Sequence, residues 1–85
     1  MIQIHDKPHP LAGTTVKVKD GGEEFRIEDW ADRVYGGSIW KENGNPAAMA
    51  YAINAAMKNL PIDNEILYGK VDGLGVLLHV SEIQQ

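Results

Sequence analysis

The chain has 85 residues, and its twelve acidic and eight basic side chains give a formal net charge of −4. A hydrophobic share of 44% is typical of a globular protein, and this length suffices for one small domain. The lack of cysteine excludes disulfides, thiolate metal ligands and a cysteine nucleophile. The negative charge argues against sequence-independent nucleic-acid binding, and no apolar run is long enough to span a membrane.

Residues 1–11 predict an extended N-terminal arm, because Pro8 and Pro10 each bias the preceding residue toward extended backbone. The same prolines exclude a helix that would bring His5 and His9 onto one face. We therefore expect solvated imidazoles and no metal site in this arm. The first residues also lack the basic region and apolar stretch of a signal peptide, which favours a cytoplasmic protein.

Alternating polar and apolar residues predict a strand at 14–19, and Phe25 and Ile27 continue the alternation in an antiparallel partner after a glycine turn. From residue 27 the apolar spacing changes to three and four. Residues 29–35 then fit either a short helix, which Gly36-Gly37 would end, or a continuing bent strand.

A helix is predicted at residues 46–59. Asn45 can supply the capping oxygen, and Pro46 is tolerated at the first helical position because its missing N–H needs no partner there. Six alanines follow within eleven residues, and alanine has the highest helix propensity. The larger apolar residues, at spacings of three and four, predict a buried stripe that comprises Met49, Ile53, Met57 and Leu60.

Asp72-Gly73 predicts a β-hairpin between residues 65–71 and 74–80. A two-residue turn pairs Val71 with Leu74 and sets one face of apolar residues, which are Leu67, Val71, Leu74, Val76, Leu78 and Val80. We expect Leu67, Val76 and Leu78 to be buried. The opposite face is also too apolar to be fully solvated. The alanine-rich helix is its expected cover, because small side chains allow a helix to pack close to a sheet.

The stretch Tyr68–Ile83, a hairpin followed by a single turn, resembles the closing strands of SH3-like small barrels. Together with Asp29–Val34 it also resembles small hypothetical proteins of phage and prophage genomes. The predicted fold is therefore mainly β with one inserted helix, a small, partly open, SH3-like antiparallel barrel over residues 12–85. The helix at 46–59 departs from a plain SH3 domain, and the acidic, tyrosine-rich loops that bind proline-rich peptides are absent. The resemblance thus implies no ligand.

The candidate catalytic residues form no recognisable motif. Neither Ser38 nor Ser81 lies in a nucleophile elbow, and no glycine-rich loop precedes a helix that could cradle phosphate. His79 has no positioned acid that the sequence reveals, so we expect a hydrogen-bonded structural histidine. The sequence predicts no enzyme, no cofactor and no bound metal.

A cluster of aromatic residues at 30–40 predicts a contact with protein. Trp30 is expected in the core, whereas Tyr35, Ile39 and Trp40 are bracketed by glycines and by a polar run and are expected near the surface. The leading hypothesis is a non-enzymatic interaction module, an accessory protein of the phage or prophage type that binds another protein or itself.

The alternative hypothesis is a nucleic-acid-binding accessory barrel. Lys17 and Lys19 share the outward face of the first strand, Arg26 lies in the same half of the chain, and nearby aromatics could stack on bases. The acids of that half would repel phosphate and oppose this hypothesis. A small hydrolase ranks third, since no motif favours it.

Overall fold

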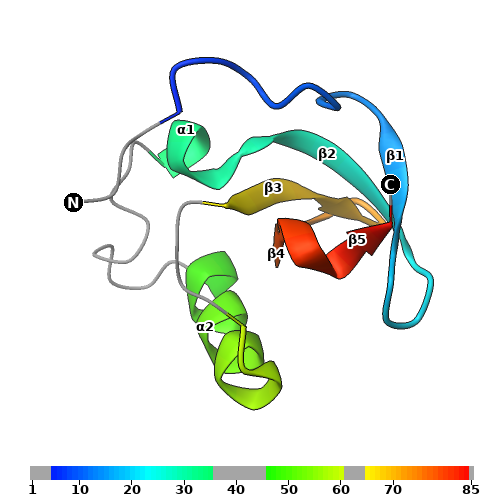
Figure 1. Ribbon diagram of the computed structural model, residues 1–85, viewed down its shortest axis with the longest axis vertical. Coiled ribbons are helices and arrows are strands. Elements are labelled where there is room, and N and C mark those ends of the chain that lie inside the picture. Colours follow the sequence, from blue (N-terminus) through cyan, green and yellow to red (C-terminus); the bar gives the residue numbers. More distant parts are fainter. Residues whose placement is uncertain (1–4, 36–45, 61–64, 85) are drawn as a thin grey trace.

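The computed structural model describes residues 5–35, 46–60 and 65–84. The elements within these ranges are, in chain order, β1 (Thr15–Val18), β2 (Glu24–Trp30), α1 (Ala31–Tyr35), α2 (Pro46–Lys58), β3 (Ile66–Val71), β4 (Leu74–His79), the 3-10 turn η1 (Val80–Glu82) and β5 (Ile83–Gln84). The strands form one antiparallel sheet in the order β4-β3-β2-β1-β5, which curls into a half-barrel (Figure 1). The mainly β prediction is confirmed, but two α-helices are present in these ranges where one was predicted.

The hairpin of β3 and β4 has the predicted register. Val71 pairs with Leu74 and Leu67 with Leu78, as a two-residue turn requires. Asp72 and Gly73 have φ angles of 52° and 79°, and positive values at both positions are the mark of a type I′ turn. This turn twists in the same sense as the strands, so the hairpin register follows from the local sequence.

The concave side of the curled sheet holds an inner cluster of large apolar side chains. Its buried members are Val18, Phe25, Ile27, Leu67 and Ile83. Val76 and Leu78 pack against this cluster but are only half-buried, so their predicted burial is wrong. The reason is that β4 is an edge strand, and its side chains have a neighbouring strand on one side only. Leu74, beside the turn, is 71% exposed.

A β-bulge explains why the sequence pattern changes within β2. Ile27 pairs with Gly69 but Asp29 pairs with Tyr68, so Glu28 is an extra residue without a cross-strand partner in the register. The extra residue reverses the alternation, and Trp30 therefore faces the inner cluster together with Leu67. Both alternatives for residues 29–35 hold in part, because the strand continues to Trp30 and α1 follows directly.

The other face of the sheet carries a second, helix-side cluster. Its buried members are Ala31, Ala48, Tyr51, Ala55, Ile66 and Leu77. The predicted cover of the hairpin is confirmed, since α2 supplies the alanines and Tyr51 that pack on β3 and β4. The predicted boundaries of this helix are also confirmed to within one residue.

The predicted buried stripe of α2 is wrong. Met49, Ile53 and Met57 are 58%, 63% and 82% exposed, whereas Tyr51, on the other side of the helix, is 2% exposed. Small side chains bring the helix closer to the sheet than large ones do, so the alanine face is the one that packs. Apart from Tyr51, the larger apolar side chains of the helix consequently point away from the barrel.

The chain closes the sheet with η1 and β5. The single turn predicted after the hairpin is present as η1, one residue earlier than the expected 81–83. After it, Ile83 pairs with Val18 of β1, and the backbone N–H of Lys19 donates to the carbonyl oxygen of Glu82 at 2.8 Å. This last strand was not predicted from the sequence. Within the described ranges, the structure has no helix long and apolar enough to cross a membrane.

Candidate functional site

The outward side of α2 is the most apolar exposed surface that the described residues form. Met49, Ile53 and Met57 recur every four residues, which places them in one row about 12 Å long on the helix. Ala50 and Ala56, both exposed, lie on either side of this row. We call these five residues the outer α2 face.

The polar residues of α2 point back toward the barrel. The Asn54 amide donates to Glu82 Oε2 at 3.3 Å, and Lys58 Nζ lies 3.0 Å from Asp20 Oδ2. The carboxylate of Asp20, together with that of Glu82 at 4.0 Å, raises the pKa of Lys58 above its ordinary value. Both side chains therefore bridge α2 to the turns of the barrel, and neither contributes polarity to the outer α2 face.

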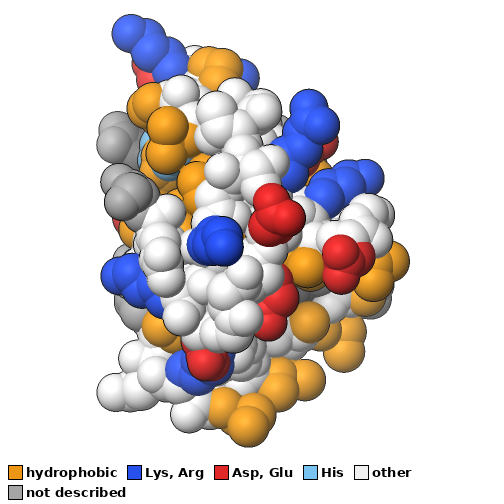
Figure 2. Space-filling view, turned by 90° about the vertical axis from the view of Figure 1, so that its right-hand side faces the viewer, with side chains coloured by type: hydrophobic (Ala, Val, Ile, Leu, Met, Phe, Trp, Pro, Cys, Tyr) orange, Lys and Arg blue, Asp and Glu red, His pale blue; other side chains and the backbone are white. Residues whose placement is uncertain are grey.

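Figure 2 shows apolar side chains gathered at the lower end of the molecule, at the level that α2 occupies in Figure 1. A helix whose opposite sides are both apolar is normally buried on both. In this chain one side is buried against the sheet and the other is in contact with solvent. An exposed apolar surface of this kind usually marks a contact with another molecule.

Of the protein-binding residues predicted from the sequence, only Tyr35 can be placed. Its ring packs on the helix-side cluster and meets Tyr68 edge to face at a centroid distance of 6.0 Å. Ile39 and Trp40 lie outside the described residues. The prediction that Tyr35, Ile39 and Trp40 form a contact site therefore stays a prediction, and Tyr35 itself is half-buried.

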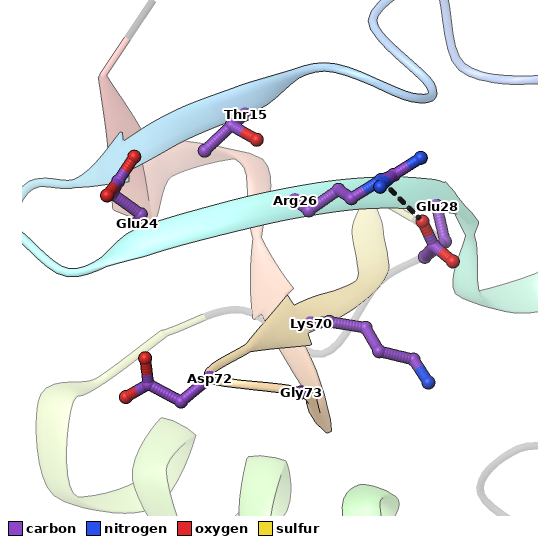
Figure 3. A pocket seen from close by; sticks show the side chains of 7 residues that line it. All are labelled: Thr15, Glu24, Arg26, Glu28, Lys70, Asp72 and Gly73. Carbon is purple, nitrogen blue, oxygen red and sulfur yellow. Dashed lines mark ion pairs between the residues drawn. The ribbon is translucent and has the colours of Figure 1, made fainter.

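The basic residues of the nucleic-acid alternative are exposed but interleaved with acids. Lys17 pairs across the ladder with Glu24, and Arg26 Nε lies 3.4 Å from Glu28 Oε2. On the face of the sheet that α2 covers in part, the uncovered area forms a shallow polar pocket. Its lining residues are Thr15, Glu24, Arg26, Glu28, Lys70, Asp72 and Gly73 (Figure 3). Lys19 is also exposed and is not part of this lining. The lining holds three acids and two bases, so it has no positive field that would select phosphate.

The N-terminal arm docks on the indole of Trp30, which corrects the expectation of solvated imidazoles. The His5 ring stacks on Trp30 at 3.8 Å, and the His9 ring, in a side chain that is 9% exposed, meets its edge at 4.6 Å. His9 Nδ1 accepts a hydrogen bond from the backbone N–H of Leu11 at 3.0 Å. The indole offers a broad apolar surface to both rings. Trp30 lies 25 positions after His5 and 21 after His9, so no local sequence pattern predicts these contacts.

Asp32 anchors the start of the same arm. Its Oδ2 accepts from the backbone N–H of His5 at 2.9 Å and lies 2.8 Å from the His5 ring Nδ1. Oδ1 of the same carboxylate is buried and accepts no hydrogen bond. Across the described parts of the chain, no group of three histidine, aspartate or glutamate side chains is placed to hold a metal.

His79 caps η1, as expected of a structural histidine. Its Nδ1 accepts from the backbone N–H of Ser81 at 3.2 Å and lies 2.8 Å from the Ser81 hydroxyl oxygen. Glu82 completes the cap, because its Oε1 accepts from the backbone N–H of His79 at 3.0 Å. The serine and the histidine lie close together, but the geometry is that of a helix cap.

The comparisons with known proteins found no match for this chain, neither to a family model nor to a curated protein nor to a solved structure. The outer α2 face is therefore the feature of the described residues that bears most directly on function. Its sequence signal, large apolar residues four apart, is visible in the chain, but spacing alone cannot tell whether such a row faces the core or solvent.

Proposed function

We propose that this chain is a non-enzymatic protein-interaction module and that the outer α2 face is its contact surface. The observation that carries the proposal is the exposure of Met49, Ile53 and Met57 on a helix whose small residues already pack on the sheet. Burying such side chains contributes roughly 1.5–3 kcal/mol each when they leave water completely. A partner that covers this row would therefore gain most of its binding free energy there.

A photo-crosslinking amino acid placed at Met57 tests this proposal, because Met57 is the most exposed residue of the row. The chain is produced in cells that naturally carry its gene, with the same amino acid at Lys70, in the polar pocket, as the control. We expect covalent protein adducts from position 57, few from position 70, and loss of the former when Ile53→Glu is added. Equal yields from the two positions, or adducts that survive Ile53→Glu, would contradict the proposal.

We further propose that the half-barrel is SH3-like and that the protein is an accessory protein of the phage or prophage type. The order of hairpin, η1 and short closing strand supports the first statement, since the resembling sequence stretch covers the same residues. Only the sequence resemblance supports the second. Genes for capsid or tail proteins beside this gene would favour the phage assignment, and a neighbourhood of metabolic genes would contradict it.

A further inference from the structure

The outer α2 face is symmetric about Ile53. Met49 and Met57 lie four residues before and after it, and Ala50 and Ala56 lie three residues before and after it. At about 100° per residue, all five side chains fall within about 60° of Ile53 around the helix. Reading the face in either chain direction thus gives the same order of side chains, Met-Ala-Ile-Ala-Met.

In a two-fold contact between identical helices, a face with this symmetry brings like side chains together. In such a contact, each residue meets a residue of the other copy, and the reverse pair recurs. If two copies of α2 cross antiparallel at Ile53, Met49 of each copy meets Met57 of the other, and the alanines at the flanks allow the helices to approach closely. Large apolar side chains therefore meet each other along the whole row.

The charges of α2 do not oppose this pairing. Lys58 is the only charged residue of the helix, and its contact with Asp20 keeps it on the barrel side. Asn54 is likewise held by Glu82. An antiparallel pair also places opposite ends of the two helix dipoles next to each other.

Resting on the proposed function, we propose that the occupant of the outer α2 face is a second copy of this chain, in a two-fold antiparallel α2–α2 contact centred on Ile53. The helix is about 20 Å long, so this contact is smaller than the roughly 800 Å² per partner of a standard stable interface. The expected dimer is therefore weak, and its formation should need chain concentrations well above the low micromolar range. Each chain carries a net charge of −4, so added salt should strengthen the association by screening this repulsion.

Sedimentation of the purified chain between about 5 μM and 1 mM tests the dimer. We expect a rise in average mass from one copy toward two, and no rise for Ile53→Glu. Leu74→Glu is the matched control, because it makes the same charge change at an exposed apolar residue on the opposite face of the sheet. Circular dichroism verifies that both variants are folded. A chain that stays monomeric at 1 mM, or a dimer that Ile53→Glu leaves intact, would overturn the inference.

Disulfide trapping tests the antiparallel arrangement, and the lack of native cysteine makes single-cysteine variants unambiguous. Helix axes about 8–10 Å apart bring Cα atoms on the two-fold axis to within roughly 6 Å, which a disulfide can span. Ile53→Cys should therefore form a disulfide with its own copy under mild oxidation by oxidised glutathione, and Leu74→Cys should not. In an equimolar mixture of Met49→Cys and Met57→Cys, the mixed disulfide should exceed either symmetric one by severalfold. Preferential 49–49 and 57–57 disulfides would overturn the antiparallel contact.

The crosslinking at Met57 separates this inference from the proposed function. An adduct with the mass of two copies supports both. Adducts with a different protein, together with a monomer in sedimentation, would overturn the second copy as occupant and leave the interaction module standing. A lack of any site-specific adduct would contradict both.

Discussion

The two faces of the curled sheet are packed with different kinds of side chain. The inner cluster consists of large residues from the strands themselves, and Phe25, Ile27 and Leu67 have no exposed surface. The helix-side cluster is built largely from alanines and a single tyrosine of α2. The strands thus form the main core, whereas α2 is held by the close approach of its alanines and leaves Met49, Ile53 and Met57 exposed.

The largest effect should come from truncating the inner cluster. We expect Phe25→Ala to lower the free energy of unfolding by about 3–5 kcal/mol, because it removes a fully buried ring and leaves a cavity. Urea denaturation measures the loss, and Ile27→Val, at about 1 kcal/mol, keeps the measurement possible if the alanine variant does not fold. A loss below 1 kcal/mol for Phe25→Ala would mean that the inner cluster is not the main core.

The close approach of α2 should be broken by enlarging a single alanine. Ala55 is 2% exposed against the sheet, so Ala55→Leu should destabilise the fold by about 1–3 kcal/mol through overpacking. Ala56→Leu adds the same atoms on the exposed side of the helix and should change stability by less than about 0.5 kcal/mol. Thermal unfolding at low micromolar concentration compares the two variants. Equal losses would show that the helix does not depend on its small face.

The stability of the fold should depend on pH through His9, which docks on Trp30 beside the inner cluster. Burial lowers the pKa of His9 below its ordinary value, and the charge of His5 lowers it further, against the opposing charges of Asp29 and Glu65. The folded state therefore binds the proton less readily than the unfolded state. The contribution of His9 to stability is complete above the unfolded pKa of about 6.5 and is lost as the pH falls below it.

Urea denaturation at pH 7.5, 6 and 5 measures this dependence. His9→Asn keeps an acceptor for the Leu11 N–H but cannot be protonated, so its stability should fall less between pH 7.5 and 5 than that of the unmodified chain. Identical pH profiles for the two proteins would show that the docked imidazole has no part in the acid sensitivity.

The smallest change in stability should come from a substitution in the polar pocket on the uncovered part of the sheet. Arg26 pairs with Glu28 at 3.4 Å with most of its side chain in solvent, and such surface ion pairs typically contribute 0–1 kcal/mol. Arg26→Gln should therefore change the unfolding midpoint only slightly, and the difference should shrink further in 0.5 M salt. A loss of more than 1 kcal/mol in the free energy of unfolding would show that this ion pair contributes substantially to the stability of the fold.

The parts of this fold that could be predicted from the sequence are those that short-range geometry determines. Asp72 and Gly73 adopt the positive φ angles of one turn type, and that turn sets the register of both strands. The capping role of His79 involves only residues up to Glu82, and a structural histidine was the expectation. In both cases the decisive contacts lie within a few residues of each other.

The remaining parts depend on contacts that no local pattern encodes. The row of Met49, Ile53 and Met57 was predicted to be buried because large apolar residues at spacings of three and four usually face a core, and only the packing of the alanines on the sheet reveals that this row faces solvent. The extra residue Glu28 reverses the alternation of β2, which made strand and helix indistinguishable there. The docking of the arm on Trp30 likewise joins distant segments.

The pairing of β5 with β1 has a consequence for the order in which the fold assembles. Ile83 and Val18 are 65 residues apart, whereas the hairpin partners Val71 and Leu74 are three apart. Closing a long loop costs more chain entropy than closing a short one, and within the described residues two pairs between β5 and β1 offset this cost. The hairpin is therefore expected to form early and β5 to join last. In the folded protein, β5 is the strand that detaches most readily, so its amide hydrogens should exchange with solvent before those of β3.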